Sequence, residues 1–274
     1  MRKEQFSISE LEVGKVTVSQ NETDTGKGLS KAIWSDCNIL NMLVDPYYGH
    51  VLRDDFIQTT GTHFTTANNY ILAGANGTFA KTAADQNGVA LLTAPGTDND
   101  EAYIQLNTTV GVIKLDATTD WWFEARVKIN QITTAQGVFV GLLGDAAAIG
   151  ADFMTDNTMA LKALDYIGFH AMIANDGACI FDAVHSITSQ HRISVKTAIH
   201  TPTAATSWIK FGMKSKSGVN QYFVNGIPCV TTVLTSAHDY PLNKYCMPAF
   251  ATKCGSAAAN TLSIDWWQCA QLRA

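Results

Sequence analysis

The stretch Trp121-Trp122-Phe123-Glu124-Ala125-Arg126-Val127-Lys128-Ile129 decides the fold class of this chain. From Phe123 to Ile129, apolar residues alternate strictly with the charged residues Glu124, Arg126 and Lys128. Successive side chains of a strand point to opposite faces, so this stretch is predicted to be a strand with one buried face and one solvated face. After a loop, residues 137–143 are almost entirely apolar and are predicted to form a second, more fully buried strand.

Short apolar runs separated by turn residues continue on both sides of this pair. Asn76-Gly77 and Asn87-Gly88 are turn signals upstream, because Asn and Gly tolerate positive φ. Downstream, residues 207–214 and 219–224 are expected to pair as a hairpin around Lys216-Ser217-Gly218. This spacing predicts an all-β sandwich or barrel, whereas residues 144–162 allow either a short helix or a long loop.

The chain closes on a second patterned stretch, residues 262–273, which is expected to lie inside its sheet. Alternation places five apolar residues on one face: Leu262, Ile264, Trp266, Ala270 and Leu272. Polar residues fill the other face, among them Ser263, Asp265, Gln271 and Arg273.

Composition limits the possible functions. The chain has 274 residues, enough for one large β domain or two ordinary ones. Its net charge is −5, and no cluster of five basic residues occurs, which argues against nucleic-acid binding. No apolar run approaches 18 residues and no apolar segment follows Met1-Arg2-Lys3, so neither a membrane span nor a signal peptide is expected.

The six cysteines lack the spacing of a metal site, since no pair has the Cys-x-x-Cys arrangement. They are expected to be free buried thiols of a protein that folds in the cytosol. The residues concerned are Cys37, Cys179, Cys229, Cys246, Cys254 and Cys269.

Residues 1–50 differ from the rest and are predicted to form an extended N-terminal arm, with a polar first half and an apolar second half. The turn Asp45-Pro46 ends the apolar half. Two uses remain open: the apolar residues anchor the chain to another subunit, or they pack on their own domain. The candidate anchor residues are Trp34, Ile39, Leu40, Met42, Leu43, Tyr47 and Tyr48.

Residues 51–274 resemble the concanavalin A-like lectin/glucanase jelly roll, a two-sheet antiparallel sandwich. The matching segments are residues 98–106, 123–127, 138–142, 165–169, 222–226 and 264–267. The form that they resemble most is the one found in tailed-phage virion proteins of the capsid decoration or head-fibre type. The arm, residues 1–50, lies outside this resemblance.

Enzymes of this fold need a pair of carboxylates facing each other across the substrate. The chain has six Glu residues, none after Glu124, and no Glu-x-Asp motif in the strand region. Glu124 shares the charged face with Arg126 and Lys128, where it is expected to be exposed. No Gly-x-Ser-x-Gly motif is present either. No catalytic residue is therefore assigned, and the chain is not expected to be an enzyme.

Two other kinds of site are considered. Asp98, Asp100 and Glu101 gather oxygen ligands of the kind that Ca²⁺ prefers, but the full Asp-x-Asp-x-Asp-Gly loop is missing, so a solvated turn is the favoured interpretation. Trp121, Trp208 and Trp267 are candidate ligand-contact aromatics, since one ring of each Trp-Trp pair is expected to face outward. Apart from this Ca²⁺ candidate, no cofactor is predicted.

The resemblance implies a structural virion protein, most specifically a phage capsid decoration protein that stabilises the head surface through its arm. Its partners would be the major capsid protein or other virion subunits and a second or third copy of itself. It would be located on the capsid surface after assembly in the host cytoplasm. The alternative is a carbohydrate-binding, lectin-like module that contacts glycans, and a glycan hydrolase is the third interpretation.

Overall fold

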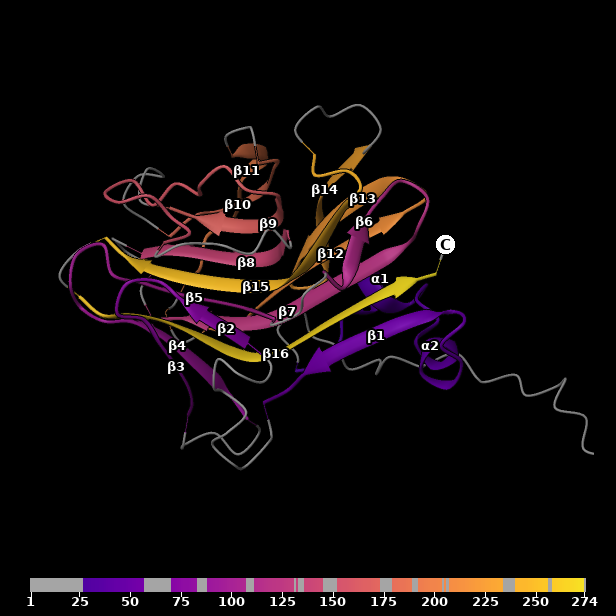
Figure 1. Cartoon of the computed structure of the whole chain (residues 1–274), viewed down its shortest axis with the longest axis horizontal. Helices are drawn as coiled ribbons and strands as arrows, with labels where there is room; N and C mark the ends of the chain where they lie inside the picture. The colour runs from indigo at the N-terminus through magenta and orange to yellow at the C-terminus, as the bar shows by residue number, and fades with distance from the viewer. Residues whose placement is uncertain are drawn as a thin grey trace, which may run out of the picture.

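The computed structural model describes residues 27–56, 70–82, 88–106, 111–130, 132, 136–144, 152–172, 179–188, 192–203, 205, 207–233, 240–255 and 258–273. Within these residues, two eight-stranded antiparallel sheets face each other, which confirms the predicted two-sheet sandwich. The strand predicted from Trp121 to Ile129 is β7, with those bounds. Figure 1 shows the two sheets, with the last strand, β16, crossing the molecule beside β1.

Sheet A has the order β14-β13-β12-β7-β16-β4-β3, and β1 also pairs with β16. Its strands are β1 (Gly49–Asp54), β3 (Thr78–Lys81), β4 (Ala90–Ala94), β7 (Trp121–Ile129), β12 (Ile209–Lys216), β13 (Val219–Val224), β14 (Ile227–Val233) and β16 (Asn260–Leu272). The predicted hairpin is confirmed as β12–β13, with Ser217 and Gly218 at positive φ in its turn.

Sheet B has the order β11-β10-β9-β8-β15-β5-β2, and β6 also pairs with β15. Its strands are β2 (Tyr70–Ala73), β5 (Glu101–Leu106), β6 (Ile113–Leu115), β8 (Gln136–Gly144), β9 (Tyr166–Ala171), β10 (Phe181–Ser186), β11 (Ile193–His200) and β15 (Lys244–Cys254). Within residues 144–162, the described part contains an isolated bridge between Met154 and Leu161 and no helix.

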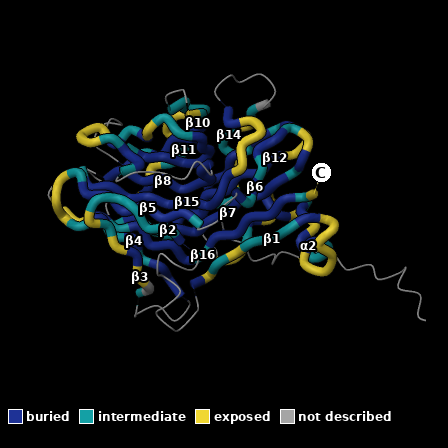
Figure 2. Tube along the Cα trace, in the orientation of Figure 1, coloured by how far each residue is buried: buried dark blue, intermediate teal, exposed yellow. Residues whose placement is uncertain are grey.

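The main core lies between the sheets and contains the inward side chains of β7, including Phe123 and Val127. Two further apolar clusters cover the outer faces: one lies on sheet B beneath residues 153–161, and the other lies on sheet A beneath residues 29–42. Both sheets are therefore buried on both faces over much of their area, as the dark blue strands of Figure 2 show.

The predicted arm contains two short helices where the structure describes it, α1 (Lys31–Trp34) and α2 (Ile39–Val44). Both pack on sheet A, and the proposed boundary at residue 50 falls inside β1. Residues 1–26 lie outside the described residues. Among the described residues, the helices are too short to cross a lipid bilayer.

The predicted alternation of the closing strand is wrong beyond Ile264, because β16 contains a β-bulge between Ile264 and Trp266. Leu262 and Ile264 face the main core as expected, but past the bulge Trp267 takes the inward position and Ala270 lies on the outer face. One extra residue in a strand exchanges the two faces of everything that follows it.

Candidate functional site

The outer face of sheet B is filled by the protein's own chain. Phe153 lies among Tyr103, Phe139 and Tyr166, with ring centroids 5.7, 5.0 and 6.0 Å away. All four rings are buried, with exposed fractions of 0 or 1%. Burying an aromatic ring contributes roughly 1.5–3 kcal/mol, so Phe153 holds this segment firmly in place. This face therefore offers little surface to a ligand.

The predicted metal residues do not converge on one point. Glu101 is buried on the outer face of sheet B, where its carboxylate accepts the backbone N–H groups of Phe153 and Met154 at 2.8 and 3.0 Å. Asp100 instead accepts the side-chain amide of Asn76 at 2.9 Å, and Asp98 is exposed.

A Ca²⁺ ion needs several oxygen ligands at one position, so Asp98, Asp100 and Glu101 do not fit the predicted ion. Among the residues that the structure describes, no three His, Cys, Asp or Glu side chains group in a way that could hold a metal ion.

Glu101 also has a buried cationic partner, Lys253, whose ammonium group lies 3.4 Å from the Glu101 carboxylate and 2.9 Å from that of Asp156. Burial nevertheless raises the pKa of Glu101 to about 7, because desolvation outweighs the backbone hydrogen bonds and the charge of Lys253. These charges secure the segment that covers sheet B, which is a structural role.

The outer face of sheet A is different, because helices cover one part of it and an open hollow lies on another part. Strand register places Lys214, Trp122, Ala270 and Val51 side by side on neighbouring strands β12, β7, β16 and β1. The helices α1 and α2 lie over this row, and Trp122, Ala270 and Val51 belong to the apolar cluster beneath them. We call residues 31–44, which contain these helices, the cap.

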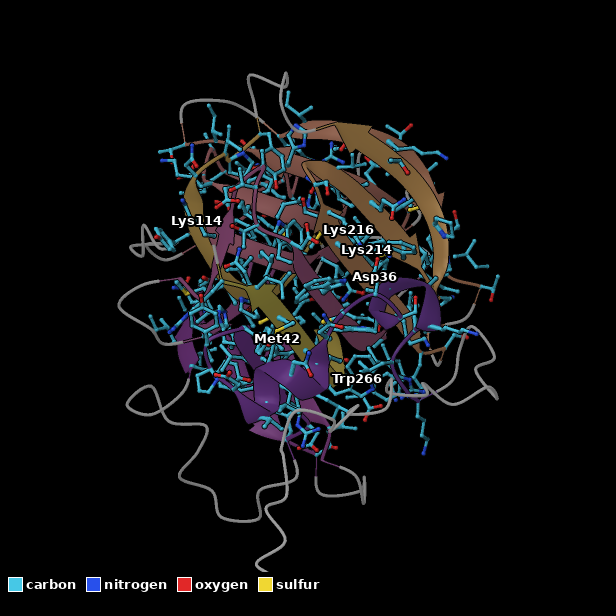
Figure 3. The ribbon with its side chains drawn as sticks, turned by 90° about the vertical axis from the view of Figure 1, so that its right-hand side faces the viewer. Asp36, Met42, Lys114, Lys214, Lys216 and Trp266 are labelled. Atoms are coloured by element: carbon cyan, nitrogen blue, oxygen red, sulfur yellow. The ribbon has the colours of Figure 1, made fainter. Side chains whose placement is uncertain are left out.

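Polar contacts fix the cap at its edge. Asp36 accepts the indole N–H of Trp122 at 3.0 Å and forms ion pairs with Lys214 and Lys216 at 3.1 and 3.4 Å. Although burial opposes it, these partners hold the pKa of Asp36 below its ordinary value. Figure 3 faces the cap, with Asp36, Lys214 and Lys216 close together and Trp266 lower in the same view.

The expectation that Glu124 and Arg126 are exposed is wrong. Their exposed fractions are 0 and 5%, because the cap and the preceding residues cover the charged face of β7. One carboxylate oxygen of Glu124 accepts the backbone N–H of Ser30 at 3.0 Å and the indole N–H of Trp34 at 2.7 Å. Burial raises the pKa of Glu124. Arg126 pairs with Asp265, the bulge residue of β16.

Residues 27–30, which we call the strap, cross the outer face of sheet A just before the cap. Their backbone is held by side chains of the sheet. Lys210 donates to the carbonyl of Gly28 at 3.1 Å, and the indole N–H of Trp266 donates to the carbonyl of Lys27 at 2.7 Å. Together with the Ser30–Glu124 bond, these contacts position the strap beside Trp266.

Next to the strap, sheet A has an open hollow of about 240 Å³. Its walls are the strap at residues 27–29, the end of β1 at residues 53–55, and β16 at residues 266–268. The β-bulge at Asp265 turns the ring of Trp266 to this outer face, while Trp267 enters the core. Pockets for drug-sized ligands typically have about 300–1,000 Å³, so the hollow fits a smaller unit, such as one sugar ring.

The hollow has polar groups that lack partners within the described residues. Arg53 is exposed and lies opposite Gln268 in the β1–β16 register. Gln268 is 7% exposed, and its side-chain nitrogen is buried and donates no hydrogen bond to any residue that the structure describes. A buried donor without an acceptor costs about 1–3 kcal/mol, so an acceptor that reaches the Gln268 nitrogen would stabilise the protein.

The two carboxylates at the end of β1, Asp54 and Asp55, differ in their hydrogen bonds and in their exposure. Asp54 accepts the backbone N–H of Phe56 and the hydroxyl of Tyr70, both at 2.8 Å, so both of its oxygens are used. Asp55 is exposed and lines the hollow. The hollow therefore presents one indole ring, one guanidinium, one amide and one free carboxylate.

Of the three predicted ligand-contact aromatics, two are excluded. Trp121 and Trp267 are 0 and 2% exposed and belong to the main core, so neither ring offers a surface to a ligand, although residue 267 lies in the wall of the hollow. Trp208 is half-buried on the outer side of sheet A, with the Arg126 guanidinium 4.4 Å and the Lys128 ammonium 4.8 Å from its ring centre. These two cations lie over the ring of Trp208, so Trp266 is the better candidate for an aromatic ring that contacts a ligand.

The anchor residues also separate into two groups. Trp34, Ile39 and Met42 are buried against sheet A in the described chain. These three residues therefore pack on their own domain, which is the second of the two predicted uses. Leu40 is half-buried, whereas Leu43, Tyr47 and Tyr48 are 63, 77 and 49% exposed.

No protein-family model and no curated protein match this sequence. Solved structures match its fold. Peanut lectin has 13% identity and a TM-score of 0.57, covering 82% of this chain and 99% of the lectin. The carbohydrate recognition domain of Emp47p has 12% identity and a TM-score of 0.53, covering 82% of this chain and 97% of that domain.

A third similar structure is a GH16 protein of a mixed-linkage glucan locus in Bacteroides ovatus, determined with a glucan product. It has 12% identity and a TM-score of 0.54, covering 79% of this chain and 98% of that protein. At these identities, the similarities show the fold alone. The chain has the concanavalin A-like jelly-roll fold that the sequence resembles. The comparisons give no support to a virion origin.

Proposed function

We propose that this protein is a lectin-like carbohydrate-binding module whose ligand site is the hollow at Trp266. One observation supports the proposal most strongly: a partly exposed indole ring beside an unpartnered amide, a guanidinium and a carboxylate. Aromatic rings offer an apolar face to the C–H groups of a sugar, and the polar groups around them bond to its hydroxyls.

The chemistry of the hollow suits a neutral sugar. The Arg53 guanidinium donates hydrogen bonds, the Asp55 carboxylate accepts them, and the Gln268 amide can do both. Since Arg53 and Asp55 carry opposite charges, neither an anionic nor a cationic ligand gains a net electrostatic advantage there. Each hydrogen bond to a charged group contributes about 1.5–3 kcal/mol, and burial of part of the sugar ring on Trp266 adds to this.

Binding without turnover is part of the proposal. Glycoside hydrolysis needs two carboxyl groups about 5–9.5 Å apart on either side of the glycosidic bond. Asp55 is exposed in the hollow, whereas each oxygen of Asp54 already accepts a hydrogen bond, from Phe56 or Tyr70. Glu124 lies beneath the cap, where it holds Ser30 and Trp34.

The proposal is tested on an array of neutral and charged glycans with the full chain and two variants. Trp266→Ala removes the platform, whereas Tyr245→Ala removes an aromatic ring that is 44% exposed elsewhere and serves as the control. The proposal predicts binding by the wild type and the control, and at least a tenfold loss in Trp266→Ala. Equal binding by all three proteins would contradict the site, and no binding by any of them would contradict the function.

A second candidate is attachment to a virion surface as a capsid decoration protein. It is favoured by four exposed apolar side chains at the end of the cap and in the turn after it: Leu43, Val44, Tyr47 and Tyr48. Figure 2 shows this exposed region at the edge of the molecule, on α2 and the turn after it. Co-sedimentation with capsid shells from the same source tests this candidate: the wild type would bind, and a variant with Ser at these four positions would not.

A further inference from the structure

The segment formed by the strap and the cap, residues 27–44, is attached to the sandwich as a separate unit. It precedes β1, the first strand that the structure describes, so it can leave sheet A without unthreading any other part of the described chain. Its apolar contacts form a cluster of their own, distinct from the main core between the sheets.

The polar contacts of this segment are also made mainly with sheet A. Glu124, Lys210 and Trp266 bond to backbone atoms of the strap, and Lys214 donates to the carbonyl of Ala32 at 2.9 Å. In effect, the outer face of sheet A binds residues 27–44 as a peptide. Nothing in these contacts requires that the segment come from the same chain, since a second copy carries the identical segment.

A short connection joins the segment to β1. We call residues 45–47 the hinge; Tyr47 donates its N–H to the Asp45 side chain, and Tyr48 donates to the Asp45 carbonyl, at 2.9 and 3.1 Å. Tyr48 is already fixed to the sandwich, because its carbonyl accepts the N–H of Arg273 at 3.0 Å. Opening the hinge therefore breaks few contacts.

Among the described residues, four of the seven large apolar side chains that are exposed lie at this hinge. Leu43 and Val44 precede it and are 63 and 75% exposed, while Tyr47 and Tyr48 are 77 and 49% exposed. We call these four residues the hinge patch. When two copies exchange a terminal segment, their two hinges come together around the two-fold axis. Exchange would therefore bring one hinge patch against the other and cover both.

We propose that this protein forms a two-fold dimer by exchanging residues 27–44, so that the segment of each copy docks on sheet A of the other. The contacts of Ile33, Trp34 and Met42 with sheet A are kept, and the hinge patches become the new interface. If the hollow at Trp266 is the ligand site, as proposed above, residues 27–29 of one copy line the hollow of the other.

The test is complementation between two full-length variants. Ile33→Asp prevents the segment from docking, because Ile33 is a fully buried side chain of the cap that packs on sheet A. Gly212→Leu prevents the sheet from receiving a segment, because a side chain at 212 occupies the position of Ile33. An equimolar mixture contains one intact sheet, in the Ile33→Asp chain, and one intact segment, in the Gly212→Leu chain.

Native mass spectrometry distinguishes the variants by mass. The wild type is expected as a dimer, each variant alone as a monomer, and the mixture as a heterodimer. A monomeric wild type would overturn the proposal. A dimeric wild type without a heterodimer in the mixture would also overturn it, because the dimer would then form through another surface. None of these results depends on glycan binding, so the dimer and the proposed function can fail separately.

Hinge length provides a second measurement in which both sheets and both segments remain intact. Deleting Asp45 and Pro46 shortens the hinge and keeps the hinge patch, so that the segment can no longer reach its own sheet; light scattering should show more dimer. Inserting a flexible Gly-Ser linker between Pro46 and Tyr47 lets the segment fold back, and the dimer fraction should fall at least tenfold. Equal dimer fractions in the two variants would contradict the exchange.

Discussion

Gly212 lies directly beneath Ile33, so that a Cβ at position 212 would stand under 3.0 Å from the end of the Ile33 side chain. The register of β12 and β7 places Gly212 opposite Glu124, which holds Ser30 and Trp34 on the same face. Glycine at this position lets α1 approach the backbone of the sheet closely.

Gly212→Ala should lower the free energy of unfolding by about 1–3 kcal/mol, because the added methyl group overpacks the contact with Ile33. Urea unfolding measures this value. Shortening Ile33 to Val or Ala in the same chain should recover part of the loss, since the two side chains then fit. Additive effects of the two substitutions would show that residues 212 and 33 do not contact each other.

Glu124 is predicted to hold the strap and cap by accepting hydrogen bonds. Glu124→Ala leaves the N–H groups of Ser30 and Trp34 without their acceptor, at about 1–3 kcal/mol for each buried donor. Glu124→Gln keeps a carbonyl oxygen and should cost less. Hydrogen exchange of the Ser30 amide measures the difference: it should be fastest in the Ala variant. Identical exchange in both variants and the wild type would show that Glu124 does not hold the strap.

Stability should depend on pH through Glu101, whose pKa is about 7 in the folded protein because of burial. A carboxyl group with a raised pKa binds its proton more tightly when folded, so ionisation destabilises the folded state. The contribution is lost as pH rises from the unfolded pKa of about 4.3 toward 7. The groups that face Glu101 are Lys253, which lowers its pKa, and Asp152, which raises it.

Urea unfolding of the wild type and Glu101→Gln between pH 5 and 8 measures this dependence. The wild type should lose stability relative to the Gln variant as pH rises, by at most about 3 kcal/mol. A stability difference that is constant across this range would show that Glu101 keeps its ordinary pKa.

Lys253 is predicted to be essential to the segment over sheet B, because its ammonium lies between Glu101 and Asp156. Above pH 7, Lys253→Met leaves the Glu101 carboxylate buried without a cation or forces it to take up a proton, which costs up to about 3–5 kcal/mol. The double variant Lys253→Met with Glu101→Gln should be more stable than Lys253→Met alone. Thermal unfolding of the three variants tests this; a double variant that is less stable than either single variant would contradict the pairing.

Local patterns in the sequence predicted the strands well because alternation is a local property. Phe123 and Val127 occupy the main core, as their spacing requires. The same alternation placed Glu124 and Arg126 in water, whereas residues about 90 positions earlier cover them. A contact between two segments that are far apart in the sequence produces no periodic pattern in either segment, so the burial of Glu124 could not be predicted.

The candidate site was missed for a related reason. The ring of Trp266 reaches the outer face because of the bulge at Asp265. A bulge adds one residue to a strand, and the alternation of apolar and polar residues in the sequence does not reveal where that residue lies. The Trp266-Trp267 pair did indicate that one ring points outward. The sequence alone could not decide which one, nor bring Arg53 and Gln268 beside it.

The indole N–H resonances of the six tryptophans provide the most direct measurement of the central claim, since each ring gives its own signal in a ¹⁵N-labelled protein. The protein is titrated with a glycan that it binds on the array, and the Trp266 signal is assigned by its absence in Trp266→Phe. The account predicts that the Trp266 resonance shifts saturably while that of buried Trp121 stays unchanged. Glycan binding that leaves the Trp266 resonance in place, or no binding of any glycan, would contradict it.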